Sequence, residues 1–138
     1  MNDLIFSGAL TKRDFHEKVD ELQETLLGMV QAESKLHHEF AHGLYARQLF
    51  IPAGSAYVGK IHRFSHFRIV LKGRLLIVTD TGRYECQAPH FMITTAGTRR
   101  VGYAFTDSVI MTIHATDKTD LQEIENEIIM PREELVLS

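Results

Sequence analysis

The N-terminal part of the chain, residues 1–42, has the apolar spacing of a helix. Five apolar residues recur every three or four positions and so share one helical face: Phe15, Val19, Leu22, Leu26 and Val30. Thr11 is a suitable N-cap, and Asp14 places a negative charge where the helix dipole favours it. Gly28 weakens the pattern, so the helix ends there or continues toward Ser34. We expect residues 1–42 to form a mainly helical extension, packed on the rest of the domain, with a histidine-rich segment at its end.

The middle of the chain, residues 43–115, changes to the pattern of short β-strands. It is rich in β-branched and aromatic residues, and glycine, proline and aspartate interrupt it at short intervals. The candidate strands are 43–51, 55–61, 66–72, 74–79, 83–88, 90–95, 99–105 and 108–114. Short strands with regular turns and no helix between them indicate an antiparallel sandwich or barrel.

The C-terminal part, residues 116–138, is predicted to form a short helix and a tail. Asp117 or Thr119 would cap the helix, because both side chains can accept a hydrogen bond from its first turn. A short edge strand is expected after the helix, at 127–130. The chain is therefore predicted to be one domain in three parts: 1–42, 43–115 and 116–138.

The bulk composition is that of one ordinary globular domain. The 138 residues include 44% hydrophobic and 24% charged residues, and the formal charge is −3. No basic surplus or run of Lys and Arg indicates nucleic-acid binding. Cys86 is the single cysteine, so no intramolecular disulfide can form, which fits a reducing compartment. Without a recognisable targeting or membrane-length apolar segment, we expect a cytoplasmic protein with no nucleic-acid or membrane partner.

Two short motifs in the β-rich part carry a family resemblance. The first comprises Pro-Ala-Gly-Ser at 52–55, His62, His66 and Ile-Val-Leu-Lys-Gly at 69–73, and the second comprises Pro89 and Ala-Gly-Thr at 96–98. Together they resemble the two motifs of small single-domain cupins, and are similar to those of uncharacterised cupin-like proteins of tailed bacteriophages. The resemblance covers about half of the chain. It implies an all-β fold, a double-stranded β-helix or jelly-roll barrel, over 43–115. The N-terminal helix and the short C-terminal helix predicted above complete the expected fold.

The sequence departs from the cupin motifs at the residues that usually hold a metal ion. When the motifs are aligned on Gly73, His66 falls where the family has a glutamate. His62 lies one position from the usual second histidine, and Arg100 stands where the second motif has its histidine. The family's metal site is therefore incomplete if it is transferred strictly.

His62 and His66 can share a metal ion only if the chain turns between them. They are four residues apart, or about 13 Å on a straight strand, which is too far for one ion. We expect a turn at 63–65 that brings the two histidines face to face. A helical His-x-x-x-His pair is the other way to converge, but the surrounding residues favour strand.

A third ligand follows from the last two predicted strands. Segments 99–105 and 108–114 are predicted to form a hairpin in which Arg100 and His114 are opposite each other. His114 would then stand beside the position of the missing histidine. The predicted metal ligands are His62, His66 and His114. Imidazole suits divalent transition metals, and we expect zinc, iron or nickel.

The strand faces that carry the histidines allow two interpretations. In segment 66–72, His66 and Arg68 share one face, while three apolar residues share the other. In the first interpretation the polar face lines a cavity inside the barrel, and other elements cover the apolar face. In the second, the apolar face is the core and the histidines face water. The cupin-like turns favour the cavity.

Two functions from different classes follow from these observations. The first is a metal-binding cupin-like protein of unknown reaction, in which an arginine orients a small anionic ligand. The candidate arginines are Arg68 and Arg100, with Arg47 as a further candidate. The second is a metal-free binding or structural module, such as a ligand sensor, assembly protein or virion-associated protein. The sequence leaves open whether the protein is an enzyme.

Two further expectations concern the remaining apolar and histidine residues. The apolar rows Phe67/Ile69/Leu71 and Val101/Tyr103/Phe105 are long for a chain of this size, and one short helix does not cover both. They predict a homo-oligomer. The histidine-rich segment contains His37, His38 and His42, which are expected to be solvated or locally bonded.

Overall fold

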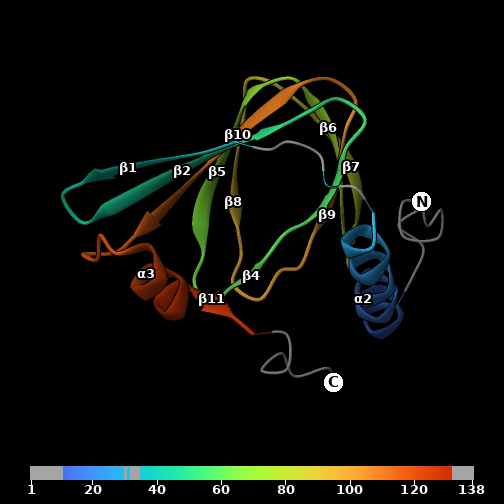
Figure 1. Ribbon diagram of the computed structural model, residues 1–138, viewed down its shortest axis with the longest axis horizontal. Helices are drawn as coiled ribbons and strands as arrows, with labels where there is room; N and C mark the ends of the chain where they lie inside the picture. The colour runs from blue at the N-terminus through green and yellow to red at the C-terminus, as the bar shows by residue number, and fades with distance from the viewer. Residues whose placement is uncertain (1–10, 30, 32–34, 132–138) are drawn as a thin grey trace.

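The computed structural model describes residues 11–29, 31 and 35–131 and consists mainly of antiparallel β-strands (Figure 1). A five-stranded antiparallel sheet forms one wall, in the order β1-β2-β10-β5-β8. Its strands are β1 (Lys35–Ala41), β2 (Leu44–Ile51), β5 (His66–Lys72), β8 (His90–Thr94) and β10 (Ser108–Ala115). A four-stranded antiparallel sheet in the order β3-β9-β6-β7 forms the facing wall. Its strands are β3 (Ala56–Val58), β6 (Arg74–Thr79), β7 (Gly82–Gln87) and β9 (Val101–Ala104).

Aliphatic side chains from both walls fill one end of the space between the sheets. The buried members of this cluster are Ile51, Val70, Leu75, Ile77, Cys86, Ala104 and Ile110. They alternate with outward-facing neighbours, so the period-two pattern of the sequence is what closes the core. The predicted all-β jelly-roll barrel with an N-terminal and a short C-terminal helix is confirmed.

Helix α2 (Lys12–Leu27) covers the outer face of the four-stranded sheet. The predicted N-cap is confirmed, because the Thr11 side-chain oxygen accepts a hydrogen bond from the Asp14 backbone N–H at 3.2 Å. The helix ends at Gly28, and Val30 lies outside the described residues. Its buried apolar residues Phe15, Val19 and Leu22 pack on Leu76, Val78 and Val101. No helix in the described ranges is long and apolar enough to cross a membrane.

The C-terminal segment closes one end of the barrel. Helix α3 (Leu121–Ile128) runs into β11 (Ile129–Met130), which pairs with β4 (Ile61–His62). The expected edge strand after this helix is therefore present. The cap is Asp120, whose side chain accepts from the Glu123 N–H at 3.0 Å, rather than either predicted residue. All three candidates are good acceptors, so only the backbone path at the first turn decides between them.

The first cupin-like turn is a tight crossing from one wall to the other at Gly73. Its φ of +90° is in the left-handed region, and a Cβ there would lie 2.5 Å from the Asp107 carbonyl oxygen and 2.3 Å from Ser108 Oγ. Only glycine fits both restrictions. The turn sends the chain from β5 directly into β6 of the facing sheet.

The predicted hairpin of segments 99–105 and 108–114 is wrong. Strand β9 pairs with β3 and β6, whereas β10 pairs with β2 and β5, so the two consecutive strands belong to different sheets. The chain crosses between the walls at the turn that was expected to close a hairpin. A short turn between two alternating strands has the same local pattern in both cases, so the sequence could not distinguish them.

The histidine-rich segment forms β1 and not the end of a mainly helical extension. It pairs along its whole length with β2, across a turn at Gly43 whose φ is +68°. Most of its side chains are exposed, so no apolar alternation marked it as a strand. Residues 35–41 are a strand because their backbone pairs with β2, which the apolar pattern of the segment does not predict. Figure 1 shows the β1–β2 hairpin extending beyond the barrel.

Candidate metal centre

His62 and His66 come together because the chain turns between β4 and β5. The turn lies at residues 63–65, as expected, and the two ring centroids are 4.2 Å apart. Two contacts from distant parts of the chain hold β4 in place: the Gly97 N–H donates to the His62 carbonyl oxygen at 2.9 Å, and His62 pairs with Ile129 of β11. The second cupin-like turn and the C-terminal segment thus both position His62.

His114 joins the pair from β10, the strand next to β5. Its ring centroid lies 5.1 Å from that of His62 and 4.6 Å from that of His66. Each of the three residues offers one potential ligand atom, and these atoms all lie within 4.8 Å of one another. The three predicted residues are therefore close enough to hold one metal ion.

Each histidine of this cluster has one ring nitrogen engaged by a neighbouring group. His62 Nδ1 lies 3.1 Å from the Lys60 carbonyl oxygen, and His66 Nδ1 lies 3.3 Å from that of Phe64. A carbonyl oxygen only accepts, so each Nδ1 carries the proton, which leaves the Nε2 lone pair for an ion. His114 Nε2 lies 2.9 Å from Thr112 Oγ1, which leaves Nδ1. This is the usual environment of metal-binding histidines, in which the second ring nitrogen is held by an outer partner.

The donor set fits a transition metal by its electrostatics as well. Burial, followed by the neighbouring His66 and His114, lowers the pKa of His62 to about 3. Burial, followed by His66 and Arg47, lowers the pKa of His114 to about 4. The pKa of His66 is also lowered, mainly by burial. The rings are therefore neutral at neutral pH, which is the form that binds a metal. The buried Nε2 of His66 has no hydrogen-bond partner, so its lone pair is available.

Arg68 and Arg100 reach the same cavity from facing sheets. Arg68 follows His66 by two residues on β5, and Arg100 precedes β9. Both are buried, with exposed fractions of 2% and 9%. Burial, together with the nearby Arg68 charge, lowers the pKa of Arg100 to about 10, so it stays cationic at neutral pH. Arg100 is not opposed to His114 in a hairpin, but both line the cavity.

Neighbouring hydroxyl groups orient the two guanidinium groups. Arg68 Nη2 donates to the Tyr57 hydroxyl at 2.6 Å, and Arg100 Nη2 donates to Thr94 Oγ1 at 3.0 Å. Gly102 is needed for the first contact, because a Cβ there would lie 2.1 Å from the Tyr57 ring. Arg68 Nη1 and Arg100 Nε remain buried without a hydrogen-bond partner.

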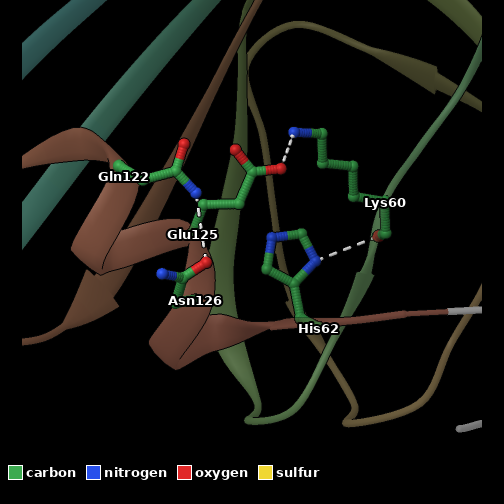
Figure 2. Close-up of polar contacts among 5 residues, drawn as sticks. All are labelled: Lys60, His62, Gln122, Glu125 and Asn126. Atoms are coloured by element: carbon green, nitrogen blue, oxygen red, sulfur yellow. Dashed lines mark hydrogen bonds and ion pairs between the residues drawn. The ribbon is translucent and has the colours of Figure 1, made fainter.

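The histidines and arginines line one cavity of about 370 Å³. Helix α3 forms part of its wall, where Ile124 and Ile128 pack on Tyr45. Figure 2 shows Lys60 extending to the Glu125 carboxylate of α3, while its carbonyl oxygen holds the His62 ring. The cavity interpretation is therefore correct for β5, where His66 and Arg68 point inward. Its apolar residues Phe67 and Leu71 face outward, with 46% and 45% exposed.

Sequence reasoning missed several polar residues of the cavity, among them Tyr57, Lys60 and Glu125. Thr112 lies two residues before His114, so alternation along β10 puts both on one strand face, and both line the cavity. Tyr57 and Glu125 approach from β3 and α3, and no local pattern connects those elements to the cavity. In the histidine-rich segment, His37 bonds to Glu39 at 2.6 Å and His38 Nδ1 to the Tyr45 hydroxyl at 2.7 Å. These two histidines are locally bonded, as expected.

The barrel is similar to solved cupin structures. A cupin superfamily protein from Desulfitobacterium hafniense aligns with a TM-score of 0.53 and 10% identity, over 67% of this chain and 88% of that chain. A cupin-2 domain protein from Shewanella frigidimarina aligns with a TM-score of 0.51 and 14% identity, over 69% and 92%. A salicylate 1,2-dioxygenase from Pseudoaminobacter salicylatoxidans, solved as adducts with gentisate, aligns with a TM-score of 0.58 and 11% identity.

The dioxygenase match covers 81% of this chain but 34% of that chain. No protein-family model and no curated protein sequence matches this chain. At these identities the likeness concerns the fold, and no comparison bears on the resemblance to bacteriophage proteins. The chain has the cupin barrel fold.

Proposed function

We propose that the protein binds one divalent transition metal ion through His62, His66 and His114, and a small anionic ligand beside it. The observation that supports this most strongly is the convergence of three neutral imidazoles, each with its other ring nitrogen engaged. These three residues would hold the ion, and a metal bound there would supply Lewis-acid chemistry toward water or an organic oxygen. Zinc, iron and nickel all suit imidazole.

The two buried arginines support the second part of the proposal, the small anionic ligand. A buried charge without a partner is costly, and Arg68 and Arg100 form no ion pair with any described residue. A ligand carboxylate would remove this cost, because a guanidinium binds it through paired hydrogen bonds. The two arginines would thus orient the ligand, and the cavity walls would exclude water from it. The likeness to a dioxygenase that binds gentisate adds that a small organic acid is a suitable first probe.

The metal is tested by elemental analysis of untagged protein purified without chelator. We expect about one equivalent of transition metal per chain in the wild type. The His62→Ala, His114→Ala double variant should lose it, because a single histidine holds a metal ion weakly. His37→Ala is the matched control, since His37 is exposed and outside the cavity. Equal metal content in the double variant and the wild type would refute the assignment.

A metal-free ligand-binding module is the second candidate. It is favoured by Arg100 in the position where the cupin motif has a histidine, because a buried arginine there binds anions and repels metal ions. A protein that takes up no zinc, iron or nickel but still binds carboxylates would support this alternative. The cytoplasmic location and the likeness to bacteriophage proteins stay predictions.

We further propose that a second copy of the chain covers the outer face of the five-stranded sheet. On β5, β8 and β10 this face is apolar, and Phe91 and Ile93 are 58% and 56% exposed. The apolar patch on these three strands is complementary to itself, as a two-fold dimer requires. Sedimentation should give a dimer that Phe91→Glu dissociates, whereas Leu27→Glu on α2 should not. A wild-type monomer at micromolar concentration would contradict the proposal.

A further inference from the structure

We infer that the ligand of the cavity is a small dicarboxylate, with one carboxylate held by Arg68 and Arg100 and the other by Arg47. This inference rests on the proposed function in one respect, that the cavity binds an anion. It adds a second anchor point and thereby the class of ligand. The metal ion is not needed for it.

The cross-strand register places Arg47, Thr112 and Arg68 in one row on the inner face of the five-stranded sheet. Arg47 of β2 is opposite Thr112 of β10, and Thr112 is opposite Arg68 of β5. Directly opposed residues share a sheet face, and all three line the cavity. Two strand spacings separate Arg47 from Arg68, or roughly 10 Å between their Cα atoms. The row therefore carries a cation at each end and a hydroxyl in the middle.

This row runs alongside the histidine cluster. His114 follows Thr112 by two residues on the same strand face, and Thr112 Oγ1 lies 2.9 Å from His114 Nε2. His66 precedes Arg68 by two residues on β5. A ligand stretched from Arg68 to Arg47 would pass Thr112 and lie beside the open side of the three histidines. The two anchors thus fix the ligand relative to the proposed metal position.

The charges of the cavity are not balanced by the protein. Its lining includes four cationic side chains: Arg47, Lys60, Arg68 and Arg100. Among the residues that the structure describes, Glu125 is the single acidic side chain of the lining, and it pairs with Lys60. The three arginines take part in none of the ion pairs within the described ranges.

A monocarboxylate would satisfy Arg68 and Arg100 and leave Arg47, within the described part of the chain, with no carboxylate nearby except Glu125, which already pairs with Lys60. Arg68 and Arg100 approach from facing sheets and act on the same region, whereas Arg47 lies at the other end of the row. Burial lowers the pKa of Arg47 as well, so its charge is also partly removed from water. A second carboxylate on the same ligand matches this arrangement.

Calorimetric titration of metal-free protein with succinate and butyrate tests the inference. The two acids have the same chain length, and a methyl group in butyrate replaces one carboxylate. We expect succinate to bind about tenfold or more tightly than butyrate, because one additional charge-assisted contact contributes this much. Malonate, glutarate and adipate then find the length that fits best.

Variants locate the second anchor. Arg47→Met should abolish the preference for the dicarboxylate and leave butyrate affinity within about twofold, because butyrate uses only Arg68 and Arg100. Arg13→Met is the matched control, since Arg13 is exposed on α2, which packs on the outer face of the four-stranded sheet. This variant should keep the full preference for succinate over butyrate. Arg47 is only half-buried, so its replacement is compatible with folding.

Three outcomes would overturn the inference. Equal affinity for succinate and butyrate in the wild type would remove the second anchor. A preference that survives Arg47→Met would place that anchor elsewhere. Inorganic phosphate that binds more tightly than every dicarboxylate, without any effect of Arg47→Met, would identify a single-point phosphate site. Each result is obtained without metal, so it is distinguishable from the elemental analysis that tests the metal centre.

Discussion

The two ends of the barrel interior are built from the same strands but differ in chemistry. On β5, Val70 packs in the aliphatic cluster while Arg68, two residues away on the same face, lines the cavity. On β10, Ile110 belongs to the aliphatic cluster and His114 to the histidine cluster. All four residues are buried, with exposed fractions of 1% to 5%.

Burial alone therefore does not tell what a position contributes. At the aliphatic end, burial removes apolar surface from water and stabilises the fold. At the polar end, it leaves nitrogens of His66, Arg68 and Arg100 without partners. Such groups cost stability, and the proposed anionic ligand and metal ion would supply their partners.

The largest effect is expected at the aliphatic end. Ile77 is fully buried between the sheets, and Ile77→Ala would remove its contacts and leave a cavity. We expect the free energy of unfolding to fall by about 2–5 kcal/mol in urea titration. Leu27→Ala, exposed on α2, is the control and should cost less. A loss below that of the control would mean that this end is not the stabilising core.

Zinc should stabilise the protein through the polar end. A ligand that binds only the folded state at 100 times its dissociation constant adds about 2.7 kcal/mol to the free energy of unfolding. Thermal melts with and without zinc measure this gain. His114→Ala should abolish it, whereas His37→Ala should not. An equal gain in both variants would indicate binding outside the histidine cluster.

Arg68→Met should leave the metal-free protein as stable as the wild type or more stable, by up to about 2 kcal/mol. Methionine fills similar space and removes the cost of an unpaired buried charge. Urea titration measures the effect, and loss of succinate binding in the same variant would show that function, not stability, retains the arginine. A stability loss comparable to that of Ile77→Ala would contradict the contrast between the two ends.

The smallest effect concerns pH. The pKa of His114 is about 4 in the folded protein, below its ordinary value of 6.5, so between these values the unfolded chain binds the proton and the folded chain does not. The stability of the metal-free protein therefore falls as pH decreases through 6.5. Between pH 7 and pH 6 this costs below about 1 kcal/mol per histidine. His114→Asn should reduce the pH slope of stability measured by urea titration, and an unchanged slope would show that this ring does not stay neutral.

The three histidines lie together as predicted, but His114 joins the other two through a different strand pairing. The turn at 63–65 brings His62 and His66 together as expected. The sequence predicts His114 as the third ligand from a hairpin of 99–105 with 108–114, which is wrong. His114 lies near the other two histidines because β10 pairs with β5. The face that His114 occupies was nevertheless correct, since alternation along a single strand does not depend on its partner.

The local pattern of the sequence determined most strands of the barrel, the capped helix α2 and the strand faces that carry His66, Arg68 and His114. These features depend on neighbours within a few positions, so periodicity and turn chemistry are sufficient. Tertiary structure alone decided that β9 and β10 belong to different sheets, that residues 35–41 pair as a strand, and that Tyr57 and Glu125 reach the cavity. It also placed Arg47 in one row with Arg68. These outcomes depend on which distant strands pair, because long-range register is set by the packing of the whole barrel and not by any one segment.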